Sequence, residues 1–563
     1  MTKTRTLRSN LTPGTALWAG RIAQWRALGL SDEDMQKPKI AVVNSSSELA
    51  ICFSHLDRVA AEVKQAIREA GGMPFEIRTT APSDFITNAG KHGAYILPSR
   101  DLISHDIEVQ VEGALLDGMV CLASCDKTTP GQLMAAGRLN IPTIVVICGY
   151  QQSGEWNGKH VDIEEVFLKS SYLASGKITL DELCGMANNA VRSPGVCAGM
   201  GTANSMHIVC EALGMALPGS APIAASSPRM LGFARAAGRR VVEMVWEDLK
   251  PRQIITEAAI RNAAMTVLAL SASINCVKHL QAIAIEAGLD LDMHAIFDEY
   301  ADRIPLLAAI RPTGEHLIEE LDEAGGAAAV LKRLEPLIDR NALTVTGKTV
   351  GENIASVVPK RGDVLRTLEQ PVSRRPTINI VRGSLLPGGG IVRLGSAGER
   401  RTAFRGPANI YTSRDEAIAA IEHGEVKPGD VLVLRGLGVV GGPGLAMTSA
   451  AIFALDGAGL IDKVAVITEG QLSGLVNMGL VVGEASPEAA VGGPLALLEN
   501  GDMITIDVEK KIVDLEVSEE ELARRRQLHR EFGTKVDHGF LALYQRNVSP
   551  VHKGAVIDDF PRA

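Results

Sequence analysis

The chain has 563 residues, of which 46% are hydrophobic and 22% charged, and its formal net charge is −9. These values are typical of a globular protein with about two to four domains, and the acidic excess argues against a nucleic-acid-binding protein. Eight cysteines are too few for a disulfide scaffold in so long a chain, and no apolar run reaches the roughly 18 residues that a membrane helix needs.

The first third of the chain alternates predicted strands with predicted helices. Strands are expected at residues 39–44, 74–79, 119–123 and 141–148, and helices at about 55–70, 99–116 and 132–138. This alternation predicts right-handed βαβ units around a parallel sheet.

The N-terminal residues 1–14 are polar and lack the apolar segment of a signal peptide, so we expect a protein of a reducing cytoplasm, with no membrane or nucleic-acid partner.

The pattern changes along the rest of the chain. Residues 150–180 have weak periodicity and are predicted to be peripheral, a helix is expected from about Thr202, residues 228–334 are mostly helical, and 360–375 are predicted to be a linker. Short strands follow at 377–381, 390–394, 430–434, 463–468, 503–507 and 511–515. We therefore predict an α/β fold with a parallel-sheet domain and helical additions at 1–365, and a C-terminal β-rich, barrel-like domain at 376–563.

One loop between a predicted strand and a predicted helix places a thiol, a carboxylate and an amine side by side, at Cys125, Asp126 and Lys127. In an open α/β sheet, ligands bind where strands end. Pro130 is expected at the first helical position, where its missing N–H costs nothing, and the helix N-terminus favours a thiolate. Taken alone, however, the loop is better explained as a helix N-cap at Asp126 beside a partly buried cysteine.

Cys52 and Cys197 lie in comparable loops before helices. Because parallel strands end at one edge of a sheet, the three thiols are expected to converge there. They could then hold an iron–sulfur cluster with one open iron position, a Lewis acid. Zinc bound by three cysteines is a competing interpretation, although the CxxC pairing of a structural zinc site is missing. Asp84 and Asp126 would add hard oxygen ligands suited to Mg²⁺.

Three segments resemble the signature loops of the dihydroxy-acid and sugar-acid dehydratase family. They are Ile51-Cys52-Phe53-Ser54-His55-Leu56, Cys125-Asp126-Lys127-Thr128-Thr129-Pro130 and Gly195-Val196-Cys197-Ala198-Gly199-Met200-Gly201-Thr202-Ala203-Asn204-Ser205-Met206. The resemblance extends from about residue 41 to the C-terminal helix. It implies a hydro-lyase that converts 2,3-dihydroxy acids, such as 2,3-dihydroxyisovalerate or sugar acids, to 2-keto acids, and that assembles as a homodimer or homotetramer.

The same resemblance implies a role for each site residue. Cys52, Cys125 and Cys197 resemble the ligands of the iron–sulfur cluster, for which [2Fe–2S] is favoured and [4Fe–4S] stays open. Asp84, Asp126 and a carbamylated Lys127 resemble the Mg²⁺ ligands. Ser473 resembles the serine whose alkoxide removes the proton from C2, a task that needs adjacent cations because a free serine is a very weak acid.

The sequence departs from the family pattern at some positions. Met447 stands where the family has a metal-binding Glu, and methionine is a poor ligand for a hard cation. Glu469 and Glu484 are candidates to replace that ligand, and we expect Glu484 or a water to do so. Gln471 departs from the branched-chain biosynthetic type and favours sugar-acid members.

Two other functions compete with the dehydratase. The run Gly436-Leu437-Gly438-Val439-Val440-Gly441 is a GxGxxG after a predicted strand and could belong to an NAD-dependent oxidoreductase, although a helix should start there at once. A non-catalytic iron–sulfur redox sensor could use the same three cysteines. Cys121 and Cys210 are expected to be core residues.

Overall fold

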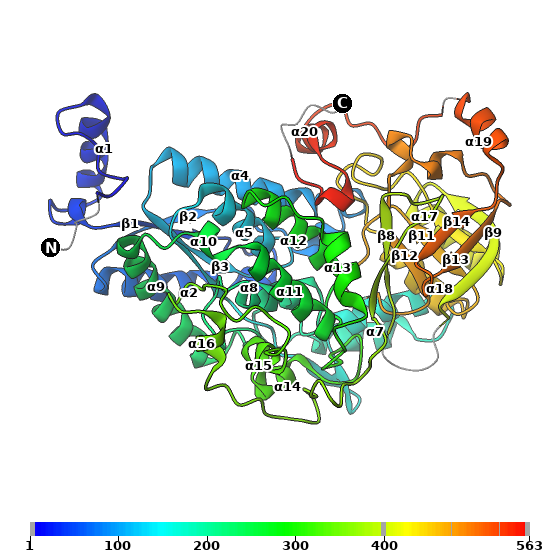
Figure 1. Ribbon diagram of the computed structural model, residues 1–563, viewed down its shortest axis with the longest axis horizontal. Coiled ribbons are helices and arrows are strands. Elements are labelled where there is room, and N and C mark those ends of the chain that lie inside the picture. Colours follow the sequence, from blue (N-terminus) through cyan, green and yellow to red (C-terminus); the bar gives the residue numbers. More distant parts are fainter. Residues whose placement is uncertain (1–5, 396–400, 475, 529, 558–563) are drawn as a thin grey trace.

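Two sheets surrounded by helices organise the chain (Figure 1). The computed structural model describes residues 6–395, 401–474, 476–528 and 530–557. The first sheet has the order β2-β1-β3-β4 and is parallel throughout. Its strands are β1 (Lys39–Asn44), β2 (Met73–Arg78), β3 (Gly118–Ala123) and β4 (Thr143–Ile147). The predicted parallel sheet is confirmed, and every residue of β1, β3 and β4 is buried, as expected for strands covered on both faces.

Helices α2 and α9 pack together on this sheet. The buried residues of α2 recur at spacings of three and four, from Leu56 and Val59 to Val63 and Ile67, which gives the helix one apolar face. The helices of this half are α1 (Ala16–Ala27), α2 (Leu56–Glu69), α3 (Asp84–Thr87), α4 (Pro98–Gly113), α5 (Thr128–Leu139), α6 (Ile163–Lys169), α7 (Leu180–Asn189), α8 (Thr202–Ala212), α9 (Pro228–Glu247), α10 (Pro251–Ile254), α11 (Glu257–Ala269), α12 (Asn275–Glu286), α13 (Met293–Ala301), α14 (Ile318–Ala324), α15 (Gly326–Arg333) and α16 (Val350–Ile354), with a hairpin of β5 (Gly154–Trp156) and β6 (Lys159–Val161).

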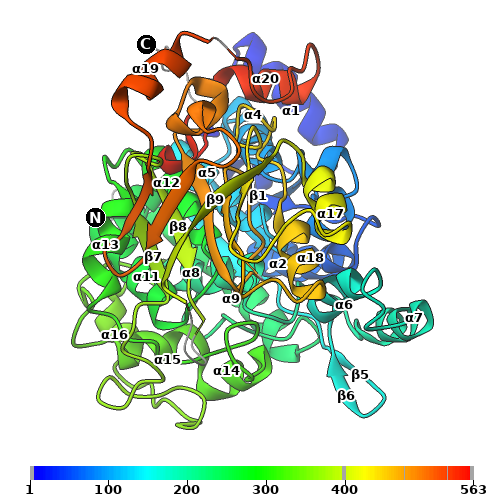
Figure 2. The ribbon, with the colours of Figure 1, turned by 90° about the vertical axis from the view of Figure 1, so that its right-hand side faces the viewer.

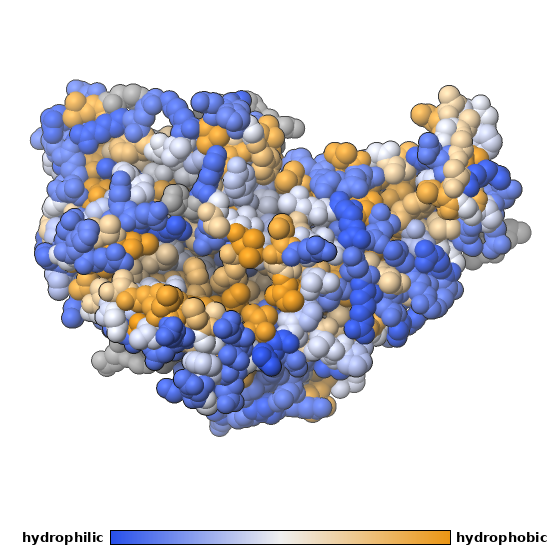
Figure 3. Space-filling view, turned by 180° about the vertical axis from the view of Figure 1, so that it is seen from behind, coloured by the Kyte–Doolittle hydropathy of each residue, from blue (hydrophilic) through white to orange (hydrophobic). Residues whose placement is uncertain are grey.

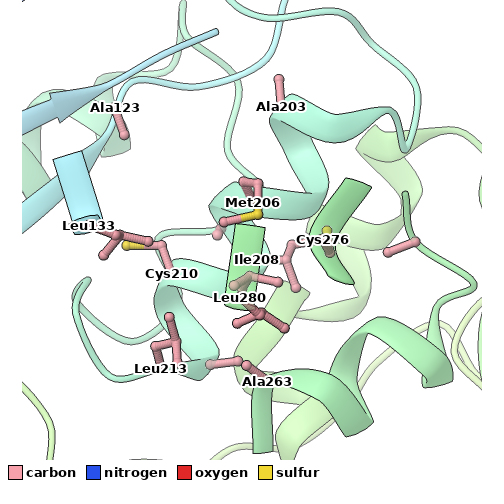
Figure 4. Packing of buried hydrophobic residues seen from close by; sticks show 14 of the residues in the cluster. Ala123, Leu133, Ala203, Met206, Ile208, Cys210, Leu213, Ala263, Cys276 and Leu280 are labelled. Carbon is pink, nitrogen blue, oxygen red and sulfur yellow. The ribbon is translucent and has the colours of Figure 1, made fainter. Parts of the chain in front are cut away.

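Helix α8 runs through the centre of the N-terminal core, and all of its residues are buried. Figure 4 shows Met206 and Cys210 of α8 among apolar side chains of neighbouring helices, with Cys276 and Leu280 of α12 close by. Cys121 and Cys210 are fully buried, which confirms that they are core residues.

The C-terminal half is built on an eight-stranded sheet in the order β14-β13-β9-β10-β11-β12-β8-β7. Strands β9 to β12 are parallel and the outer pairs antiparallel. A bridge between Arg382 and Ile512 links the two edge strands, so the sheet is nearly closed and the barrel-like prediction is confirmed. Its elements are β7 (Ile378–Val381), β8 (Gly389–Arg393), β9 (Ala403–Tyr411), α17 (Arg414–Glu422), β10 (Val431–Leu434), α18 (Ser449–Gly457), β11 (Ala465–Thr468), β12 (Leu480–Ser486), β13 (Met503–Asp507), β14 (Ile512–Leu515), α19 (Glu519–Arg526) and α20 (Phe540–Asn547).

The segment predicted to be a linker, residues 360–375, is packed against the N-terminal half. Val364 and Leu365 are fully buried, and the Arg366 N–H donates to the Leu307 carbonyl oxygen at 2.9 Å. The largest hydrophobic cluster also continues across this segment to Leu432 and Phe453 of the C-terminal half. The domain limits at 365 and 376 stay a prediction, because one core serves both halves.

Two surface features lie outside this core. Helix α1 stands away from the body in Figure 1, and none of its residues is buried. Figure 3 shows hydrophobic residues gathered in the middle of the rear face. None of the described helices is both long and apolar enough to cross a membrane.

Candidate functional site

The three cysteine loops meet beyond the ends of β1 and β3. Cys52 lies in a short 3-10 helix between β1 and α2, Cys125 follows β3 after one residue, and Cys197 lies in the loop before α8. Hydrogen bonding to Cys125 lowers the pKa of Cys52, and the same bond, with burial, raises the pKa of Cys125. The Ser124 hydroxyl also donates to the Cys52 carbonyl oxygen, which ties the first two loops together.

Cys197 belongs to the same group of thiols and is partly buried. Burial raises its pKa most, and the nearby charges of Glu164, Cys52, Asp126 and Asp84 raise it further. The structure therefore brings together thiols that are more than 70 residues apart in the sequence, as 125 − 52 = 73 and 197 − 125 = 72 show.

Lys127 lies between two carboxylates beside the thiols. Its ammonium group binds Asp126 and lies 4.0 Å from the Asp84 carboxylate, and its side chain is completely buried. Burial acts to lower the pKa of Lys127, but Asp126 and Asp84 outweigh it and raise the pKa. Burial raises the pKa of Asp84 well above the ordinary value, and the charge of Asp126 adds to the rise.

The first turn of α5 holds this loop in place, although the helix begins earlier than expected. It starts at Thr128, with Lys127 as N-cap residue, so Pro130 is the third helical residue. The Thr128 hydroxyl accepts the Ser124 N–H at 3.1 Å and donates to the Cys125 carbonyl oxygen at 2.9 Å. Pro130 fits there because the first four N–H groups of a helix have no partner within it. The N-cap reading of Asp126 is wrong.

A cavity lies over these loops. Its polar lining includes Asp84, Asp126, Glu164, Cys125, Cys197 and Ser473. Phe85, Phe167 and Met447 form an apolar wall, in which the two phenyl rings meet edge to face at 5.5 Å. Cys52 and Lys127 lie behind this lining. The wall therefore combines residues of both halves of the chain.

Ser473 comes from the loop after β11. Its N–H donates to the Ser449 hydroxyl at 2.7 Å. The Asn275 side-chain amide donates to the carbonyl oxygen of the preceding residue, Leu472, at 3.2 Å and to the Thr202 hydroxyl at 2.9 Å. A Cβ atom on Gly474 would lie 2.6 Å from the Ser273 hydroxyl oxygen. Helices α8 and α12 of the N-terminal half thus fix the position of the serine loop.

The donor set fits a metal cofactor with ligands of two kinds. The Asp84 Oδ1 atom is buried with no hydrogen-bond partner, as expected of an oxygen reserved for a cation. Within the described ranges no three His, Cys, Asp or Glu side chains are arranged around a single ion. A cluster makes a different demand, because its cysteines are shared among two or more iron atoms. Asp84 and Asp126 would supply two oxygen ligands to Mg²⁺ and leave room for a third.

Neither carboxylate expected to replace the ligand missing at Met447 lines the cavity. Glu484 forms a buried ion pair with Lys278. Glu469 accepts hydrogen bonds from the N–H groups of Gly436, Leu437 and Ala489. Both carboxylates therefore already have partners within the protein.

The sequence did not predict that Glu164 and Phe167 of α6 line the cavity, because their segment was expected to be peripheral. Figure 2 shows α6 beside α18 of the other half. Hydrogen bonds from the Ser171 hydroxyl to the Phe453 carbonyl oxygen and from the Tyr172 hydroxyl to Asp456 fasten this segment to α18. A signal was present, because Glu164 shares a helix face with apolar residues three and four positions later.

The GxGxxG segment after β10 is not followed by a helix, since α18 begins only at Ser449. Its N–H groups already bind carboxylates: Glu488 accepts from Val440 at 3.0 Å and from Gly441 at 2.8 Å. A Cβ atom on Gly438 would collide with the same carboxylate. Four of the six N–H groups of the segment bind the carboxylates of Glu469 and Glu488, and no helix starts there, so the dinucleotide-binding interpretation is wrong.

Comparison with known proteins agrees with this geometry. Residues 37–353 match the family described as dihydroxy-acid/6-phosphogluconate dehydratase N-terminal, and residues 363–555 match its C-terminal counterpart. A dihydroxy-acid dehydratase of Ignicoccus hospitalis is 40% identical over 543 residues, which cover 96% of this chain and 98% of the relative. Another, from Methanococcoides burtonii, is 41% identical over 535 residues, or 94% of this chain and 96% of the relative.

Proposed function

The chain belongs to the dihydroxy-acid/6-phosphogluconate dehydratase family and is a hydro-lyase, and on that basis we propose that it converts a 2,3-dihydroxy acid to a 2-keto acid with an iron–sulfur cluster and Mg²⁺. One observation above all supports this proposal. Ser473, from the C-terminal half, lines the same cavity as the thiols and carboxylates of the N-terminal half. A redox sensor would need no such serine.

We assign Cys52, Cys125 and Cys197 to the cluster, and Asp84, Asp126 and a carbamylated Lys127 to Mg²⁺. When bound, these groups supply Lewis-acid chemistry that stabilises negative charge on substrate oxygens. Carbamylation would convert the buried amine of Lys127 into an anionic oxygen ligand. The [2Fe–2S] form, the cytoplasmic setting and assembly as a homodimer or homotetramer stay predictions.

Ser473 acts as the base in this scheme. Its deprotonated side-chain oxygen takes the proton from C2 of the substrate, the C3–O bond breaks, and the 3-hydroxyl leaves as hydroxide. The hydroxide takes the proton from Ser473 and departs as water, and the resulting enol becomes a 2-keto acid. The Ser449 hydroxyl and the Asn275 amide hold the serine loop in position for this transfer. The apolar wall keeps bulk water away from the reacting carbons.

The apolar wall also bears on the choice of substrate. Phe85, Phe167 and Met447 favour an acid with a short alkyl end over a long polyhydroxy chain, because hydroxyl groups would lose hydrogen bonds to water there. We therefore expect 2,3-dihydroxyisovalerate to be turned over faster than gluconate, xylonate, arabinonate or glycerate. The relatives named dihydroxy-acid dehydratase agree with this choice.

The test is an anaerobic assay of keto acid from these five compounds, with three variants. Cys125→Ser should lose both the visible absorption of the cluster and activity. Ser473→Ala should keep the absorption and iron content but lose at least about 100-fold in kcat, the lower range for loss of a positioned base. Cys184→Ser, which changes an exposed cysteine, is the control and should keep both. Normal turnover by Ser473→Ala would disprove the base assignment.

A further inference from the structure

Glu164 is a buried carboxylate in the cavity wall that the proposed mechanism does not use. It is 7% exposed and lies directly against the loop that carries Cys197. A Cβ atom on Gly199 would collide with its carboxylate group. The loop thus has glycine where the carboxylate approaches the backbone most closely.

The charge of Glu164 is poorly compensated within the described part of the chain. Burial raises its pKa most and Asp162 raises it further, and a hydrogen bond from Gly199 with the charges of Arg311 and Arg393 only partly offsets this rise. Arg311 binds the neighbouring Glu165 at 3.1 Å instead. The Arg393 guanidinium group donates to the Ser271 and Gly474 carbonyl oxygens. An uncompensated carboxylate inside a protein is costly, so its place in a cavity wall points to a partner that arrives with the ligand.

The position of Glu164 indicates which part of the ligand it meets. Glu164 lies against Gly199, two residues after Cys197. Asp84 and Asp126 instead lie beside the ammonium group of Lys127. Glu164 therefore lies on the thiol side of the cavity and the aspartates on the amine side. Mg²⁺ held by the aspartates would bind the substrate carboxylate and 2-hydroxyl, and the 3-hydroxyl would then lie toward Glu164.

We propose that Glu164 binds the 3-hydroxyl group of the substrate, the group that leaves, and orients the C3–O bond for elimination. This inference rests on the proposed function. The side chain contributes a hydrogen bond and takes no part in a covalent step. It would thereby discriminate between 2,3-dihydroxy acids and acids that lack the 3-hydroxyl.

Binding to a protein that cannot turn over provides the test. On a Ser473→Ala background, we would measure by calorimetry the dissociation constants of 2,3-dihydroxyisovalerate and of 2-hydroxyisovalerate, which lacks the 3-hydroxyl. We expect the dihydroxy acid to bind more tightly. The discrimination is the dissociation constant of 2-hydroxyisovalerate divided by that of 2,3-dihydroxyisovalerate. The added substitution Glu164→Leu should reduce this ratio roughly 10- to 100-fold, the range for a hydrogen bond to a charged group. Glu164→Gln should reduce it about 3-fold or more, because it keeps a weaker, neutral hydrogen bond.

Matched controls separate this role from others. Glu165→Gln changes the neighbouring acid on the same helix, which pairs with Lys169 and Arg311, and should leave the ratio unchanged. Iron content and Mn²⁺ affinity should stay the same in Glu164→Leu. A tenfold loss of Mn²⁺ affinity would make Glu164 a cation ligand and overturn the proposal, as would an unchanged ratio in Glu164→Gln. If the unmodified protein dehydrates no acid at all, the proposed function fails instead.

Discussion

Lys127 shows how a charged side chain is kept inside this protein. The ammonium group has no exposed surface, yet Asp126 binds it directly and Asp84 lies 4.0 Å away. Removing one partner of such a group typically costs 3–5 kcal/mol, because the remaining charge stays buried. Glu164 has no such partner in the described chain, and that contrast is the reason to look for its partner in a ligand.

His294 gives the protein a dependence on pH that is separate from the cavity. Burial, with the nearby charges of His552 and Arg382, lowers its pKa to about 4, below the ~6.5 of an unfolded histidine. As the pH falls through this interval, the unfolded chain binds a proton that the folded chain does not, so the free energy of unfolding decreases. We expect this residue alone to contribute a loss of about 2 kcal/mol between pH 7.5 and pH 5.

The variant His294→Gln should remove that contribution. Urea unfolding at both pH values would then show a smaller difference in the free energy of unfolding than in the unmodified protein. An equal difference in both proteins would contradict the assignment to His294.

At the scale of single elements, a buried carboxylate stabilises the turn after β10. Glu488 accepts hydrogen bonds from the N–H groups of Val440 and Gly441. Glu488→Ala should lower the free energy of unfolding by about 2–4 kcal/mol, because each unsatisfied buried N–H costs about 1–3 kcal/mol. Urea unfolding measures this loss, and Glu520→Gln on the exposed face of α19 is the control.

The same turn also predicts the result of an NADH titration. Since its N–H groups bind Glu469 and Glu488, NADH fluorescence should not increase in the presence of the unmodified protein. A saturable increase would restore the dinucleotide-binding interpretation.

Local sequence patterns predicted most elements, and the exceptions have identifiable causes. Strand β9 was missed because Gly406 and Pro407 in its middle are typical of a turn, yet Pro407 pairs with Met503 across an antiparallel ladder. Strand β12 was missed because it has an irregular register near Gly483, where Glu484 takes a positive φ of 55°. Both strands are stabilised by pairing with distant segments, which no local pattern records.

The residues of the candidate site also fall into two groups, those that the sequence identified and those that it did not. The residue types of the cysteine loops, and their resemblance to a family, were sufficient to name Cys125, Asp126 and Lys127 in advance. Glu164 could not be assigned to the cavity from the sequence, because its position depends on how α6 docks against α18 and the loop of Gly199.

At the scale of the whole molecule, the C-terminal segment connects the two halves. The Arg100 guanidinium group donates to the Ala555 carbonyl oxygen at 2.7 Å, and the Ile557 N–H donates to the Asp101 carboxylate at 3.0 Å. The Tyr544 hydroxyl donates to the same carbonyl oxygen at 2.9 Å. Arg100 and Asp101 are fully buried, so they depend on these partners.

Deleting residues 548–563 should therefore destabilise the whole protein. We expect a loss of about 3–5 kcal/mol, the range for buried charges left without partners. Because one hydrophobic cluster spans both halves, the loss should appear as a single calorimetric transition at lower temperature. Two separate transitions would contradict a shared core. Leu17→Ala, which changes an exposed residue of helix α1, is the control and should have little effect.

The cavity wall built from both halves has a consequence for synthesis on the ribosome. The three cysteines emerge within the first 200 residues, whereas Met447 and Ser473, which close the cavity over them, emerge much later. In the growing chain the thiols stay open to solvent during that interval, when both delivery of iron and damage by peroxide are easiest. A pulse of oxidant during translation should inactivate more molecules than the same pulse applied to finished protein.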